Sequence, residues 1–88
     1  MLETELEVSN VLGLHARAAA KVVSVASRYK SRIQIVKAGR PVDAKSIMAL
    51  LMLGAAKGTR LTVRVEGEDA PAAMKELCDL FARKFDVE

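Results

Sequence analysis

The stretch Arg60–Glu66, which reads RLTVRVE, alternates apolar and polar side chains without a break. A period of two is typical of a β-strand that buries one face. Leu61, Val63 and Val65 are expected to face the core, which leaves both arginines on the outer face. The pattern therefore predicts a half-buried, basic strand.

A second alternating stretch, Leu2–Val8, carries the opposite charge. Leu2, Leu6 and Val8 lie on one face beside Thr4, and three glutamates occupy the other face. Opposite charges on adjacent strands stabilise a sheet by roughly 0.2 to 1 kcal/mol per pair. We therefore expect residues 2–8 and 60–66 to be neighbours in the sheet.

Residues 32–36 and 40–43 predict the remaining two strands, with Ala38-Gly39 as the turn between them. Three further segments have the apolar spacing of helices, so the chain is expected to form a single α+β domain over residues 1–88. The first helix, over 16–28, is expected to bury a stripe of small residues opposite a polar stripe. The buried stripe is predicted to contain Ala16, Ala19, Ala20, Val23 and Ala26; the polar stripe contains Arg17, Lys21, Ser24 and Arg28.

The C-terminal segment predicts the clearest core helix. Asp69 is expected to cap its start and Pro71 to lie in its first turn. Its apolar stripe is predicted to contain Ala70, Met74, Leu77, Cys78, Phe81 and Phe85. Cys78 is thereby interpreted as a packing residue and not as a reactive thiol.

The middle helix, Ile47 to about Leu53, is apolar on every side, although a helix in so small a protein can bury only one. Leu50 and Leu53 are expected to face the sheet. Met48, Leu51 or Met52, with Ile47 at the margin, would then form an exposed patch of the kind that marks a partner surface. The alternative is a fold that covers this helix completely.

The composition excludes several classes of function. One cysteine and one histidine among 88 residues offer no internal disulfide and no ordinary zinc site, and no cofactor is expected. The acidic N-terminus is unlike a signal peptide, and the longest apolar run, residues 47–56, is too short for a bilayer, which favours a cytoplasmic protein without membrane insertion.

Basic residues are mixed with acidic ones and lack aromatic partners, which argues against nucleic acid binding. A chain of this length also favours a substrate delivered by a partner over independent enzymatic turnover.

His15, the only histidine, lies where a loop becomes the helix over 16–28. A neutral imidazole nitrogen is a competent nucleophile, and the first amides of a helix stabilise an anion. Arg17 is placed to neutralise phosphate oxygens, and Gly13 permits a close backbone approach. These residues suggest a phosphoryl group on His15. The spacing leaves open that His15 only caps the helix and that Arg17 is simply solvated.

The segment Asn10–Ala20, NVLGLHARAAA, resembles the active-site segment of the HPr family, the histidine-containing phosphocarriers of the bacterial phosphotransferase system, whose nitrogen-branch members are called NPr. A second family motif is present as AKSIMALLMLGA at residues 44–55. The resemblance covers nearly the whole chain. It implies an open-faced β-sandwich in the order βαββαβα, with three helices on one face of a four-stranded antiparallel sheet.

The resemblance also implies a phosphoryl relay. Enzyme I, charged by phosphoenolpyruvate, would phosphorylate Nδ1 of His15, and the group would pass to an acceptor protein of the same system. Arg17 would stabilise the phosphohistidine, and the apolar residues Ile47, Met48 and Leu51 would dock the partners of a monomeric carrier. The sequence leaves the sugar-uptake and nitrogen-regulatory branches open. A regulatory binding module, switched by phosphorylation, is the alternative function.

Two further residues bear on this comparison. Ser46 precedes an apolar helix and is expected to cap it; in many HPr proteins the equivalent serine is also phosphorylated by an HPr kinase/phosphorylase, which implies regulation. Ala18 departs from the proline that most family members have after the active-site arginine. Alanine restores an amide hydrogen but leaves the unfolded chain freer, at an expected cost below about 1 kcal/mol.

Overall fold

A computed structural model describes residues 1–87; Glu88, the last residue of the predicted domain, lies outside the described residues. The four predicted strands are present as one sheet with the order β1-β4-β2-β3, in which every neighbouring pair is antiparallel. The ends of two strands differ from the prediction by one residue: the first strand stops before Val8, and the second extends to Lys37. The strands are β1 (Leu2–Glu7), β2 (Arg32–Lys37), β3 (Arg40–Asp43) and β4 (Arg60–Glu66).

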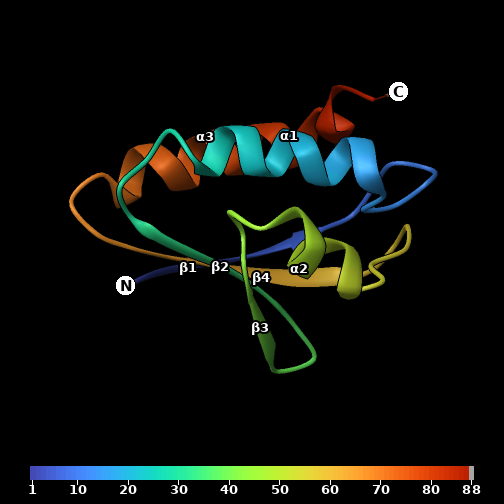
Figure 1. Cartoon of the computed structure of the whole chain (residues 1–88), viewed down its shortest axis with the longest axis horizontal. Helices are drawn as coiled ribbons and strands as arrows, with labels where there is room; N and C mark the ends of the chain where they lie inside the picture. Colours follow the sequence, from blue (N-terminus) through green and yellow to red (C-terminus); the bar gives the residue numbers. More distant parts are fainter. Residues whose placement is uncertain (88) are drawn as a thin grey trace.

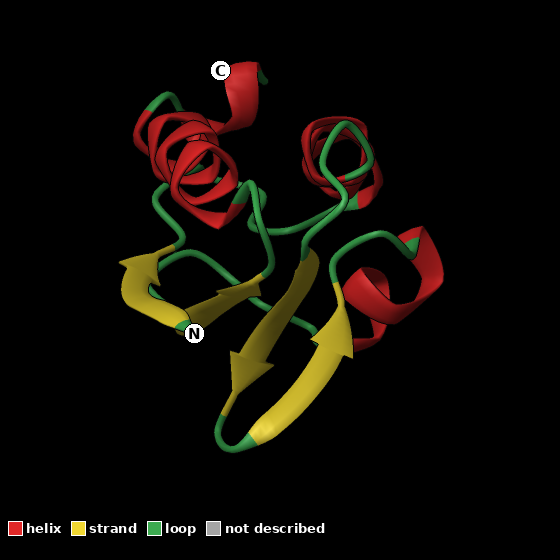
Figure 2. Cartoon of the chain, turned by 90° about the vertical axis from the view of Figure 1, so that its left-hand side faces the viewer, coloured by secondary structure: helices red, strands yellow, loops and turns green. Residues whose placement is uncertain are grey.

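The helices are α1 (Ala16–Ala26), α2 (Ile47–Met52) and α3 (Ala70–Ala82), followed by a short 3-10 helix, η1 (Lys84–Asp86). Figure 1 shows α1 and α3 side by side above the sheet, with α2 beside them toward β3. The view along the helices in Figure 2 places all three on the same side of the sheet. The predicted α+β fold, with its βαββαβα order, is confirmed. Within residues 1–87, each helix is too short to cross a bilayer.

The acidic strand and the basic strand are neighbours, as their charges predict. Glu3 lies opposite Arg64, and Glu7 lies opposite Arg60. Arg64 Nε is 2.8 Å from Glu3 Oε2, and Arg60 Nη1 is 2.9 Å from Glu5 Oε1. These ion pairs lie on the face of the sheet that the helices leave open, while the core fills the other face with Leu61, Val63 and Val65.

The buried stripe of α1 differs from the prediction. Ala16 and Ala20 are exposed, whereas Ala18 is completely buried. Alanine or valine occupies most positions of this helix, so the spacing fits more than one stripe, and packing against both α2 and α3 decides between them. The buried residues are Ala18, Ala19, Val22, Val25 and Ala26.

Phe85 does not continue the stripe of α3, because the helix ends at Ala82. Lys84, Phe85 and Asp86 have φ angles of 55°, 58° and 58°, so the chain makes a left-handed turn there. Phe85 is thereby buried against Phe81, with ring centroids 4.8 Å apart. Cys78 is half-buried at the margin of the stripe, and burial, with a smaller contribution from the charge of Asp79, raises the pKa of its thiol.

Asp69 precedes α3 as predicted, but its carboxylate forms no capping hydrogen bond. It accepts hydrogen bonds from the Lys30 amide (2.8 Å), the Ser31 amide (3.0 Å) and the Ser31 hydroxyl. These three donors satisfy the carboxylate better than one helix amide would. The hydrogen bonds, first that of the Ser31 side chain, lower the pKa of Asp69 and tie the start of α3 to the loop between α1 and β2.

Candidate functional site

His15 is the N-cap residue of α1, and its own side chain provides the cap. Its backbone is extended, with φ −80° and ψ −176°, and its carbonyl accepts the first hydrogen bond of the helix from the Ala19 amide at 2.8 Å. Nδ1 accepts a hydrogen bond from the Arg17 amide at 3.1 Å. An accepting Nδ1 carries its lone pair, so the hydrogen of the neutral ring is on Nε2.

The start of α1 is an electropositive end that lacks acidic residues in its first turn. Within residues 1–87, the amides of Ala16 and Ala18 have no hydrogen-bond acceptor, and the exposed Arg17 guanidinium has no ion-pair partner. Free amides and the aligned peptide dipoles stabilise a negative group at this end of a helix. The chain thus places a nucleophilic nitrogen, free amide donors and an exposed cation together at the start of one helix.

The loop before His15 is clamped to the segment that follows α2. The Leu14 amide donates to Ala55 O at 2.8 Å. Gly13 has φ +69°, and a Cβ built on it would lie 2.5 Å from Ala55 O and 2.9 Å from Ala56 Cα. The close approach expected at Gly13 is confirmed, and it brings the end of α2 to the residue beside His15.

Asn10 also holds this loop, although the sequence suggested it only as part of a motif. Its Nδ2 donates to Gly13 O at 2.7 Å, and the Gly13 amide donates to Asn10 O at 3.2 Å. The signal that was available is a turn-forming asparagine three residues before a glycine. Which atoms it would bind depends on the turn geometry, and the sequence does not specify that geometry.

The exposure predicted for α2 is confirmed: Leu50 is 0% exposed and Leu53 is buried, whereas Met48 is 71% exposed. Val11 and Leu12, in the loop before His15, are also exposed, and sequence reasoning missed them. Leu12 and His15 border the same shallow hollow of about 220 Å³, beside Gly54. We use the name apolar patch for the exposed apolar side chains of α2 and of this loop; they are Val11, Leu12, Ile47, Met48, Leu51 and Met52. A docking role for the patch remains a prediction.

Two polar side chains fix the ends of α2. Ser46 is the N-cap residue, as predicted, and its hydroxyl accepts a hydrogen bond from the Ala49 amide at 3.2 Å. The Lys37 ammonium, which the sequence analysis missed, donates to Leu53 O at 2.9 Å and to Gly54 O at 3.3 Å. A cation at the C-terminal end of a helix is favourable. The apolar patch is therefore presented by a helix that is capped at both ends.

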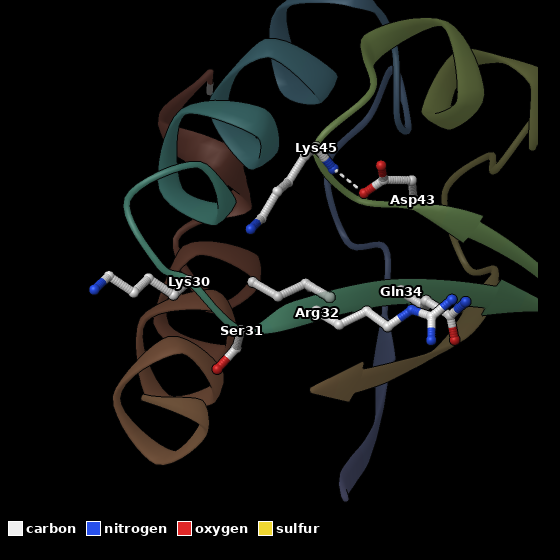
Figure 3. Close-up of a pocket in the computed structure, with 7 residues that line it drawn as sticks. Lys30, Ser31, Arg32, Gln34, Asp43 and Lys45 are labelled. Carbon is white, nitrogen blue, oxygen red and sulfur yellow. Dashed lines mark hydrogen bonds between the residues drawn. The ribbon is translucent and has the colours of Figure 1, made fainter. Parts of the chain in front are cut away.

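Another hollow, of about 320 Å³, lies away from His15, between the start of β2 and the loop before α2. Figure 3 shows that its cationic side chains do not converge, since Lys30 points away and Arg32 runs along the strand toward Gln34. The ammonium of Lys45 is bound to Tyr29 O at 2.8 Å. Within residues 1–87, no cluster of histidine, cysteine and carboxylate side chains has the arrangement of a metal site. The site at His15 is thus the arrangement with the clearest chemistry.

Comparison with known proteins identifies the family of the chain. A family model described as "PTS HPr component phosphorylation site" matches residues 2–83. The chain is 49% identical over 88 residues to the phosphocarrier protein HPr of Xylella fastidiosa strain Temecula1, covering 100% of this chain and 99% of that protein. It is 41% identical over 85 residues to the phosphocarrier protein NPr of Shewanella violacea, covering 97% and 93% of the two chains.

A solved structure of HPr from Thermoanaerobacter tengcongensis superposes with a TM-score of 0.95 at 42% identity, covering 100% of this chain and 99% of that chain. The Bacillus subtilis protein Crh superposes with a TM-score of 0.76 at 37% identity, covering 96% and 97%. The family match, the full-length relatives and the shared fold lead to one conclusion. The chain belongs to the HPr family of phosphocarrier proteins of the phosphotransferase system.

Proposed function

We propose that His15 is the phosphoryl-carrying residue of this chain. Its Nδ1 would accept the group from enzyme I that has been charged by phosphoenolpyruvate and would pass it to an acceptor protein of the phosphotransferase system. The observation that supports the proposal most strongly is the contact between Nδ1 and the Arg17 amide at the start of α1. It orients the nucleophilic nitrogen at the end of the helix where an anion is stabilised.

The transfer needs no redox step and no cofactor. The lone pair of Nδ1 attacks phosphorus, the bond from phosphorus to enzyme I breaks as the N–P bond forms, and Nε2 keeps its hydrogen. The Arg17 amide then loses Nδ1 as its acceptor and is free to donate to a phosphoryl oxygen, as are the Ala16 and Ala18 amides. The exposed guanidinium of Arg17 adds a charge-assisted hydrogen bond. Onward transfer repeats the displacement with a nucleophile of the acceptor.

The exposure of the site fits a carrier better than an independent enzyme. A phosphohistidine at the open end of α1 stays accessible to a second protein, and the apolar patch lies beside it. We propose that Ile47, Met48 and Leu51 dock partners there, and that the chain acts as a cytoplasmic monomer without nucleic acid or membrane partners. The chain is similar to relatives named HPr and to relatives named NPr. Identification of the acceptor protein would therefore show whether it serves the sugar-uptake or the nitrogen-regulatory branch.

The test is incubation with enzyme I and labelled phosphoenolpyruvate. We expect an acid-labile label on the wild-type protein, no label on His15→Ala, and transfer of the label to an acceptor. Absence of label on the wild-type protein would contradict the proposal. A label that is never passed on would favour the alternative, a binding module whose phosphorylation switches its affinity for a target.

We further propose that Ser46 is a regulatory phosphorylation site for an HPr kinase/phosphorylase. Its hydroxyl is half-buried at the start of α2, immediately before the apolar patch. A phosphate there adds a charge of about −1.5 to −2 and opposes acidic partners. Incubation with the kinase is expected to phosphorylate the wild-type protein but not Ser46→Ala, and to weaken binding of enzyme I. A kinase reaction that leaves Ser46 unmodified would remove this part of the proposal.

A further inference from the structure

Asn10 is one of two polar residues that are buried within the described chain; the other is Ser31. The Ser31 hydroxyl donates to Asp69, far from His15 and beyond the other end of α1. Asn10 instead lies in the loop that leads to His15, where its Nδ2 donates to Gly13 O at 2.7 Å. The two residues thus provide one buried side-chain donor near His15 and one remote from it.

Two donors share the carbonyl of Gly13. The Asn10 Nδ2 approaches it from the side chain, and the His15 amide donates to it at 2.9 Å. On the other side of this turn, the Leu14 amide is held by Ala55 O. The peptide group between Gly13 and Leu14 is therefore held at both ends, its carbonyl by Asn10 and its amide by Ala55. The His15 amide, in the next peptide group, donates to the same carbonyl, so the orientation of this turn determines the direction in which the His15 ring leaves the backbone.

The other half of the Asn10 amide has no partner. Its Oδ1 is buried and accepts no hydrogen bond from residues 1–87. A buried acceptor without a partner is unfavourable, and an apolar residue would avoid that cost. The presence of asparagine at position 10 is therefore explained by its Nδ2 donor, which binds Gly13 O. Aspartate would place an oxygen against that carbonyl, and alanine would leave it with the His15 amide alone.

We infer that Asn10 is a positioning residue for His15: its amide fixes the Gly13 carbonyl and so aligns Nδ1 with the Arg17 amide. This inference rests on the proposed function in one respect, that the alignment serves phosphoryl transfer. Asn10 does not contact the reacting atoms and acts only through the backbone. A nucleophile displaced by about 1 Å can lose roughly 100-fold in rate, so a small rearrangement of this turn is sufficient for a measurable effect.

The experiment compares Asn10→Ala with the matched control Ser31→Ala, since each removes one buried donor. The first readout is the ¹⁵N chemical shifts of the two His15 ring nitrogens in the unphosphorylated protein. In the wild type and Ser31→Ala, Nδ1 is expected to be the accepting nitrogen and Nε2 the protonated one. In Asn10→Ala, the ¹⁵N shifts of the two ring nitrogens are expected to move toward each other, to the averaged values of a mixture of tautomers. The second readout is the rate of phosphorylation by enzyme I, which should fall about 10-fold or more in Asn10→Ala alone.

The free energy of unfolding of both variants separates positioning from stability. Wild-type ring shifts and a wild-type rate in a destabilised Asn10→Ala protein would overturn the inference and leave Asn10 a structural residue. If Asn10→Ala does not fold, Asn10→Ser supplies the same comparison with a shorter donor. If enzyme I fails to label even the wild type, the proposed function fails, while the ring shifts still decide the role of Asn10.

Discussion

The Nδ1 atom of His15 is both the cap of α1 and the proposed nucleophile. The position of His15 at a helix start and the neighbouring Arg17 were predictable from spacing, whereas spacing left open whether His15 caps the helix or carries a phosphate. Asn10 was not predictable, because its contact with Gly13 depends on the path of the turn. Spacing thus identified the candidate residues His15 and Arg17, but it could not identify the contact of Asn10 with the turn before them.

Gly13→Ala tests the clamp beside His15. Alanine is strained at φ +69°, and its Cβ would also collide with Ala55 O. We expect a loss of more than about 1 kcal/mol in the free energy of unfolding and slower phosphorylation. The control is Gly58→Ala, where φ is +92° but no atom lies within 4 Å of the added Cβ. Urea denaturation that gives equal losses for both variants would show that the contact with Ala55 is unimportant.

At the scale of elements, local sequence predicted where helices begin better than which side they bury. The start of α1 at Ala16, the start of α2 at Ile47 and the start of α3 at Ala70 follow from the residues that precede them. The buried face of α1 could not be predicted from its sequence, because alanine and valine side chains lie on several faces of that helix. The role of Asp69 did not follow either, since its partners in the loop before β2 are 38 and 39 residues away.

Ser46→Ala tests the cap of α2 without changing the apolar patch. Loss of the hydrogen bond to the Ala49 amide is expected to lower the free energy of unfolding by about 1 kcal/mol. Ser24→Ala, on the exposed side of α1, is the control and should change stability little. A Ser46→Ala protein as stable as the control in urea denaturation would contradict the capping role.

Asp69 gives a pH dependence whose sign follows from its hydrogen bonds. Because its folded-state pKa lies below the ordinary value of 3.8, its stabilisation is present above that value and is lost as the pH falls through the folded pKa. Asp69→Asn is therefore expected to be less stable at pH 7 and to lose less stability than the wild type between pH 5 and pH 2. The measurement is urea unfolding across that range, with the exposed Glu68→Gln as control. Parallel curves for the wild type and Asp69→Asn would refute the linkage.

On the scale of the whole molecule, the sheet was the most predictable part. Alternation predicted the inner faces of the strands, and complementary charge predicted that β1 and β4 are neighbours, which their pairing and ion pairs confirm. The left-handed turn at residues 84–86 was not predictable, because three consecutive non-glycine residues adopt positive φ there, which local preference disfavours. Phe85 is buried within that turn. The hollow beside His15 also needed the fold, since Leu12 and Gly54, which border it, are distant in sequence.

Met48→Glu tests the patch as a docking surface. Met48 is largely exposed, so the substitution should leave the free energy of unfolding within about 0.5 kcal/mol of the wild type. Binding to enzyme I should weaken by about 1 kcal/mol or more, or roughly 5-fold, in calorimetric titration. Ala72→Glu, an exposed position on α3, introduces the same charge away from the patch and should bind normally. Equal affinities for the two variants would refute the placement of the surface.

The role of His15 is tested most directly by locating the phosphoryl group with ¹⁵N and ³¹P NMR after reaction of the protein with enzyme I and phosphoenolpyruvate. We expect one phosphoryl group, bonded to Nδ1 of His15, with Nε2 still protonated and the Arg17 amide resonance displaced as its acceptor changes from nitrogen to phosphate oxygen. Phosphorylation on Nε2, or on a residue other than His15, would contradict this expectation.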